Sequence, residues 1–61
     1  MKQPLPPNTE YLGEGLYVNE SSPGEIHAFS YNGDTILDEV WMELGEIIAL
    51  IDFAKKTGMP L

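Results

Sequence analysis

The chain has 61 residues, with ten Asp or Glu, three Lys or Arg, no Cys and a formal net charge of −7. A chain of this length forms one small domain that buries only about 60% of its unfolded surface, and without disulfides we expect association to support its core. All ten acids lie between residues 3 and 54, which hold no base, so direct binding to nucleic acid is excluded and a basic protein surface is favoured.

Residues 1–11 are predicted to form a proline-containing extended arm, followed by a single domain over residues 12–61. Pro4, Pro6 and Pro7 fix their own φ angles and favour extended geometry in the residues before them. The segment has no apolar stretch of the kind found in secretion signals, and no run of 18 apolar residues follows it. We therefore expect no membrane segment and a cytoplasmic location.

Three strands are predicted, over residues 16–19, 25–31 and 35–42. The first follows a turn at residues 12–15 and alternates apolar and polar side chains. Asn32-Gly33 predicts a tight hairpin between the second and third strands, because both residues tolerate positive φ. Consecutive strands joined by short turns form an antiparallel meander. The predicted fold class is α+β, with a three-stranded sheet (β-β-β) followed by one C-terminal helix.

The helix is predicted to begin near Glu43 or Leu44 and to end before Gly58. Acids stand in its first turn, bases stand in its last turn, and Gly58 suits the left-handed position that ends a helix. At about 100° per residue, its apolar side chains share one broad arc, made of Leu44, Ile47, Ile48, Leu50, Ile51 and Ala54. We therefore expect the helix to pack on one face of the sheet, with Phe53 on its flank.

The two faces of the predicted sheet both carry large apolar groups, because side chains two residues apart share a face. One assignment places an aliphatic set under the helix, comprising Leu16, Val18, Ile26, Ala28, Ile36, Val40 and Met42. The opposite face then carries Tyr17, His27, Phe29, Leu37 and Trp41. The register stays open: a three-residue loop keeps Ala28 and Ile36 on one face, whereas a two-residue turn pairs Phe29 with Ile36.

The face opposite the helix is predicted to be an interface, since one helix can cover only one face. Exposed aromatic patches mark interaction sites, and aromatic residues are enriched in interface cores. The predicted contact residues are Tyr17, His27, Phe29, Leu37 and Trp41. We expect a homo-oligomer, with a dimer through the sheet favoured, or a basic partner protein. The alternative is that the proline arm covers this face.

The sequence favours a protein that is not an enzyme, with no catalytic residue, metal or cofactor. His27 and nearby acids such as Asp38 and Glu39 could in principle form a base or a cation site. However, no nucleophile motif, glycine-rich phosphate loop or repeated ligand spacing is present. Two other functions stay open. One is an acidic nucleic-acid mimic that blocks a DNA- or RNA-binding protein, and the other is an oligomer that binds a nucleotide between aromatic rings.

Two segments carry a resemblance to a protein family. Residues 11–18, YLGEGLYV, and residues 42–48, MELGEII, resemble the corresponding parts of small uncharacterised bacteriophage and prophage proteins. Those proteins open with a proline-containing arm and a YLGDGVY-like strand, and close with an aliphatic helix. Leu44-Gly45 departs from their common Glu-Pro helix start. The resemblance implies a phage origin, a location in the host bacterial cell and a role in binding, such as antagonising a host defence or regulatory protein.

Overall fold

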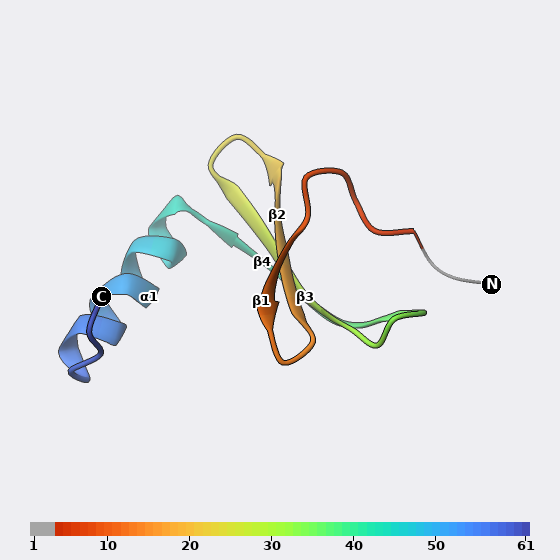
Figure 1. Ribbon diagram of the computed structural model, residues 1–61. Coiled ribbons are helices and arrows are strands. Elements are labelled where there is room, and N and C mark those ends of the chain that lie inside the picture. Colours follow the sequence, from red (N-terminus) through yellow and green to blue (C-terminus); the bar gives the residue numbers. More distant parts are fainter. Residues whose placement is uncertain (1–3) are drawn as a thin grey trace.

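A computed structural model describes residues 4–61, which form one antiparallel sheet followed by one helix (Figure 1). The sheet has the order β1-β2-β3-β4, so each strand pairs with its neighbours along the chain. The predicted α+β class is confirmed. The elements are β1 (Glu10–Gly13), β2 (Leu16–Ser22), β3 (Glu25–Tyr31), β4 (Ile36–Glu43) and α1 (Leu44–Lys56).

The prediction of three strands was wrong, because the end of the supposed arm forms β1. Glu10 pairs with Val18 and Tyr11 pairs with Tyr17. Glu14 and Gly15 connect β1 to β2 with φ angles of 55° and 79°, and positive φ at both central residues is what a two-residue hairpin needs. The usual sequence of such a turn is Asn-Gly or Asp-Gly. Glu14-Gly15 departs from that pattern, so the turn was not predicted. Of the predicted arm, residues 1–3 lie outside the described part of the chain.

The hairpin between β3 and β4 is present at the predicted Asn32-Gly33, and it contains an irregularity that fixes the register. The Asn32 side-chain oxygen accepts hydrogen bonds from the backbone N–H groups of residues 34 and 35, at 2.9 and 2.7 Å. Beyond this loop Tyr31 pairs with Ile36, but Phe29 pairs with Glu39, so β4 carries one extra residue. Ile36 therefore stands opposite Tyr31 and does not belong to the aliphatic set in which it was placed.

The ends of α1 follow the local signals in the sequence. The backbone N–H of Glu43 donates to the Glu46 side chain at 2.9 Å, which anchors the first turn. Gly58 has a φ of 86°, and the N–H of Met59 donates to the carbonyl of Ala54 at 3.0 Å. This is the left-handed termination that glycine permits. The helix is therefore a firmly bounded element.

The predicted packing of the helix on the sheet was wrong. No residue of α1 is buried, and Figure 1 shows the helix leading away from the sheet beyond the end of β4. The cause is the junction: β4 ends at Glu43 and α1 begins at Leu44, so no loop turns the chain back. The apolar side chains of the helix are consequently exposed, including Leu44, Ile48, Leu50, Ile51 and Phe53.

The buried core lies on the central strand β3 and is very small. Within residues 4–61, Phe29 and Ala28 are the only buried apolar residues, with 1% and 8% of their surface exposed. Asn19 and His27 are the buried polar residues. The overall shape is elongated, with extents of 42 × 25 × 17 Å. Folding of the sheet therefore depends heavily on one aromatic side chain.

Replacing Phe29 by Ala should remove most of the folding stability. A buried Phe→Ala change costs about 3–5 kcal/mol, which is comparable to the whole stability of a small domain. Urea denaturation followed by circular dichroism measures this loss. Leu37→Ala is the control, since Leu37 is 58% exposed and its loss should change the free energy of unfolding by less than about 0.5 kcal/mol. Equal effects of the two changes would contradict the assigned core.

Candidate functional site

One face of the sheet carries a continuous cluster of aromatic rings. The register sets Tyr11 beside Tyr17 and Tyr17 beside Phe29, with ring centroids 5.0 and 5.8 Å apart. Tyr31 meets Tyr17 edge-on at 5.6 Å. Contacts of this geometry stabilise a sheet by about 0.5–1.5 kcal/mol each beyond the area they bury. We call this the aromatic face, made of Tyr11, Tyr17, His27, Phe29, Tyr31 and Trp41.

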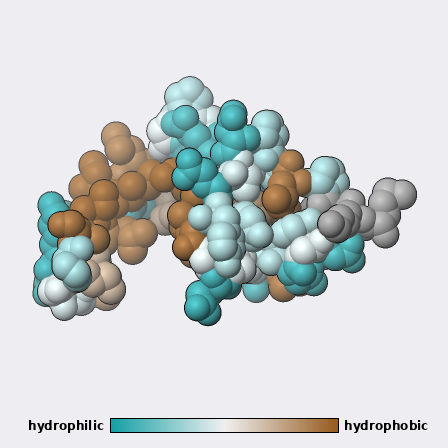
Figure 2. Space-filling view, viewed as in Figure 1, coloured by the Kyte–Doolittle hydropathy of each residue, from teal (hydrophilic) through white to brown (hydrophobic). Residues whose placement is uncertain are grey.

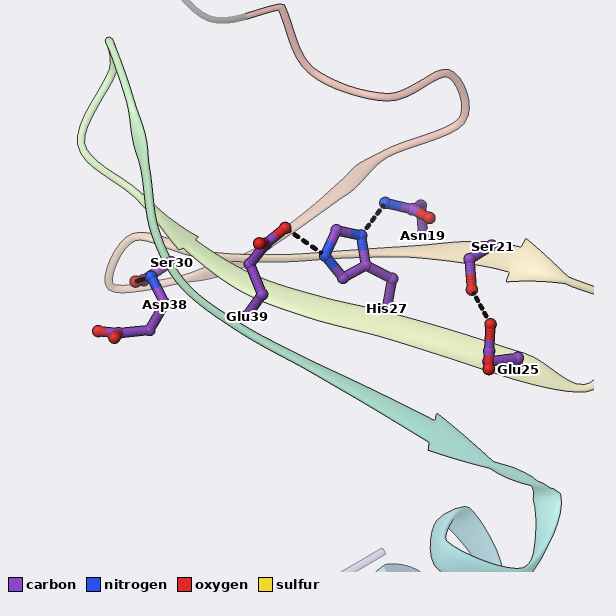
Figure 3. Close-up of polar contacts among 7 residues, drawn as sticks. All are labelled: Asn19, Ser21, Glu25, His27, Ser30, Asp38 and Glu39. Carbon is purple, nitrogen blue, oxygen red and sulfur yellow. Dashed lines mark hydrogen bonds and ion pairs between the residues drawn. The ribbon is translucent and has the colours of Figure 1, made fainter.

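His27 is the polar centre of the aromatic face. Its ring stacks on Trp41 with centroids 4.5 Å apart and lies 4.8 Å from the ring of Phe29. Its Nδ1 is 3.2 Å from the amide nitrogen of Asn19, and its Nε2 is 3.0 Å from a carboxylate oxygen of Glu39 (Figure 3). With the Asn19 amide donating to Nδ1, the Nε2–H donates to Glu39. The two contacts fix the orientation of the imidazole ring.

The arrangement around His27 supports a structural role. Both ring nitrogens already have partners, and only 6% of the residue is exposed. A buried polar side chain is tolerated in a small core when its hydrogen bonds are satisfied, and no buried side-chain N or O atom of the described residues lacks a partner. In residues 4–61, no group of three or more His, Asp or Glu side chains is placed to hold a metal ion.

The five predicted contact residues are only partly available to a partner. Tyr17, His27, Phe29 and Trp41 gather in the ring cluster, whereas Leu37 lies at the irregularity of β4. His27 and Phe29 are buried by their neighbours, Tyr17 is half-buried, and Leu37 and Trp41 are 58% and 51% exposed. Leu37 and Trp41 can therefore contact a partner directly, and the interface itself stays a prediction.

Two members of the aromatic face, Tyr11 and Tyr31, were not among the predicted contact residues. Tyr11 is 62% exposed and reaches the cluster only because β1 pairs with β2. Tyr31 is two residues from Phe29 and therefore shares its face, but it is not among the predicted contact residues. A regular two-residue turn at Glu14-Gly15 would set Tyr11 opposite Val18, and it is the irregularity between Tyr11 and Gly13 that sets Tyr11 opposite Tyr17. The position of the turn alone therefore does not predict this ring contact.

The opposite face of the sheet is aliphatic and no helix covers it, although Ala28 is buried and Val18, Ile26 and Met42 are half-buried. The register sets Val18 beside Ala28 and Ala28 beside Val40, with Ile26 beside Met42. A shallow hollow of about 310 Å³ lies over this face and is bordered by residues of β2, β3 and β4. Leu16 and Val40 remain 41% and 52% exposed. We call this the aliphatic face, made of Leu16, Val18, Ile26, Ala28, Val40 and Met42.

The apolar side of α1 adds to this uncovered surface. Figure 2 shows apolar residues gathered along the helix and continuing toward the sheet. Ile51 lies near the middle of the helical arc and is 44% exposed, and Leu44 at the start is 60% exposed. Contiguous apolar patches of this kind mark interaction sites in soluble proteins. The chain thus presents two unpartnered apolar surfaces, one on the sheet and one on the helix.

Comparisons with known proteins add no assignment. No family model, no curated protein and no solved structure matches the chain. The part of the chain that the structure describes has no helix long and apolar enough to cross a membrane. The function is therefore inferred from the chemistry of the surface.

Replacing Asn19 by Leu should test the buried polar network. The change keeps the approximate size of the side chain but leaves Nδ1 of His27 without its partner, which costs about 1–3 kcal/mol. Chemical denaturation measures the free energy of unfolding. Ser21→Ala is the matched control, because Ser21 donates an exposed hydrogen bond of 2.6 Å to Glu25 and its loss should cost less than about 0.5 kcal/mol. A larger loss for Ser21→Ala than for Asn19→Leu would contradict the network.

Proposed function

We propose that the chain is a small phage protein that acts by protein–protein contact and antagonises a host defence or regulatory protein. The observation that supports this proposal is the exposure of large apolar side chains on a body that carries many acids. Trp41 and Leu37 are each more than half exposed and stand on the same strand, β4. A tryptophan at the centre of a contact is among the side chains that contribute most to binding.

The charge of the surface supports a partner with a basic surface. Every Asp and Glu except Glu25 is exposed, and the formal net charge is −7. Asp38 and Glu39 lie between Leu37 and Trp41 along β4, so acids accompany the apolar contact residues. A complementary partner has an apolar pocket for Trp41 with Lys or Arg at its rim, and opposite charges raise the rate at which the two proteins meet.

A narrower version of this function is mimicry of a nucleic acid. The exposed acids with no base between residues 3 and 54 favour it, since a DNA- or RNA-binding groove is basic. In that case the chain and the nucleic acid compete for the same groove of the partner, so the partner binds only one of them at a time. Competition by duplex DNA or RNA distinguishes this version from contact with another basic surface.

The immobilised chain should retain a specific protein from a bacterial lysate, and Trp41→Glu and Leu37→Glu should lose it. Retention should fall as salt is raised, because exposed charges are screened within about 10 Å at 0.1 M. Quantitative mass spectrometry of the retained proteins is the measurement, and circular dichroism checks that each variant is folded.

Met59→Glu is the control for the added charge, since Met59 is 54% exposed and lies beyond the helix. This variant should retain the same protein as the unmodified chain. Equal retention by all four chains, or retention that rises with salt, would refute the proposed contact.

A further inference from the structure

The chain exposes more surface than a folded chain of its mass should. Its accessible surface is 4781 Å², whereas a folded monomer of this mass exposes about 3,950 Å². The excess is roughly 800 Å², and a stable protein interface buries about 800 Å² on each partner. The amount of unburied surface is therefore that of one interface.

Two elements of the same chain, the sheet and the helix, expose apolar surfaces that suit each other. The aliphatic face and the apolar arc of α1 are both made mostly of branched aliphatic side chains. A helix of 13 residues is about 20 Å long, and a strand of seven residues is about 23 Å long. One helix can thus cover the length of the face, as helices do when they pack on a sheet.

The helix cannot cover the face of its own chain in this conformation. A connection that turns a strand back into a packed helix needs about 2–3 residues, but Leu44 directly follows Glu43. Glu43 itself is extended, with φ −86° and ψ 174°. The helix is thereby directed beyond the sheet, and an identical helix from another chain can take the vacant place.

We propose that two copies of the chain form a dimer in which α1 of each copy lies on the aliphatic face of the other. The exchange is reciprocal, so both uncovered surfaces of both copies are buried in one symmetric contact. The dimer supplies the layer of helices that the single chain lacks. It uses the face opposite Trp41, and the contact surface of the proposed function stays accessible in it.

The proposed dimer and a complex with a basic partner should depend on salt in opposite ways, because of the charge of the chain. Two copies with a formal charge of −7 each repel one another. Salt screens this repulsion and does not weaken apolar contact, so the dimer should tighten as salt is raised. Binding to a basic partner should respond in the opposite direction, and the two interactions are therefore separable in one salt series.

Cross-linking of engineered cysteines tests the exchange directly, since the natural chain has no Cys. The chain carrying both Val40→Cys and Ile51→Cys is treated at low concentration with a short bismaleimide. Exchange gives a covalent dimer, and it also gives a mixed dimer when two differently tagged chains each carry one of the changes. The products are separated by denaturing electrophoresis and identified by mass.

The control is Ala49→Cys in place of Ile51→Cys, because Ala49 lies opposite the apolar arc of the helix. This pair should cross-link at a small fraction of the yield. A cross-linked monomer would show that the helix folds onto its own sheet. That product, an equal yield from Ala49→Cys, or no cross-link at all would each overturn the proposal.

Sedimentation of the unmodified chain and of Ile51→Glu gives a second test. The substitution places a charge in the centre of the proposed contact and should raise the dimer dissociation constant at least about 30-fold. Ala49→Glu adds the same charge on the other side of α1 and should leave the constant unchanged within about threefold. A monomeric unmodified chain at high concentration, or equal effects of the two variants, would also overturn the proposal.

Discussion

The ring stack on β3 is the interaction on which the rest of the structure depends. Phe29 is almost completely buried without any contribution from the helix, because the rings of Tyr17 and His27 shield it. A single sheet in water normally needs a second layer to exclude solvent from one face. Here the side chains of the aromatic face cover one another, and Asn19 and Glu39 satisfy the polar atoms of the histidine.

This local solution on one face leaves the other face without a cover. Short aliphatic side chains cannot fold over their neighbours as aromatic rings do, so the aliphatic face stays open. The helix is apolar enough to cover this face but does not reach it, because α1 follows Glu43 directly and no loop turns the chain back. The two faces therefore suit different partners. In the two proposals, the face with Trp41 and Glu39 contacts a basic protein, whereas the aliphatic face contacts a second copy.

Local features of the structure were predictable from the sequence, and the arrangement of the elements was not. Strand β3 and both ends of α1 were placed correctly, because the signals for them are local. Alternation of side chains indicates the strand, acids in the first turn indicate the start of the helix, and Gly58 indicates its end. Strand β1 was missed because Glu14-Gly15 forms a two-residue turn without the usual Asn or Asp. Ile36 was assigned to the wrong face because the extra residue in β4 depends on how its hairpin closes.

The candidate site was predictable only in its composition. One of the assignments left open by the sequence grouped Tyr17, His27, Phe29 and Trp41 on one face, and the register of the sheet agrees with it. Alternation determines the faces only within each strand. The sequence could not show that His27 and Phe29 would be buried by their own neighbours, because that requires the packing of rings across three strands. It also could not show that the helix leaves the sheet, since an apolar arc looks the same whether it covers its own chain or another.

The two edges of the sheet determine how far any association can extend. β1 is only four residues long, has an irregular pairing at Gly13 and follows a segment with prolines, which lack a backbone N–H. The other edge, β4, carries charged residues and an extra residue that distorts its pairing. Features of this kind block the addition of further strands. These features disfavour growth of the sheet from either edge, which leaves the faces and the helix as the surfaces for association.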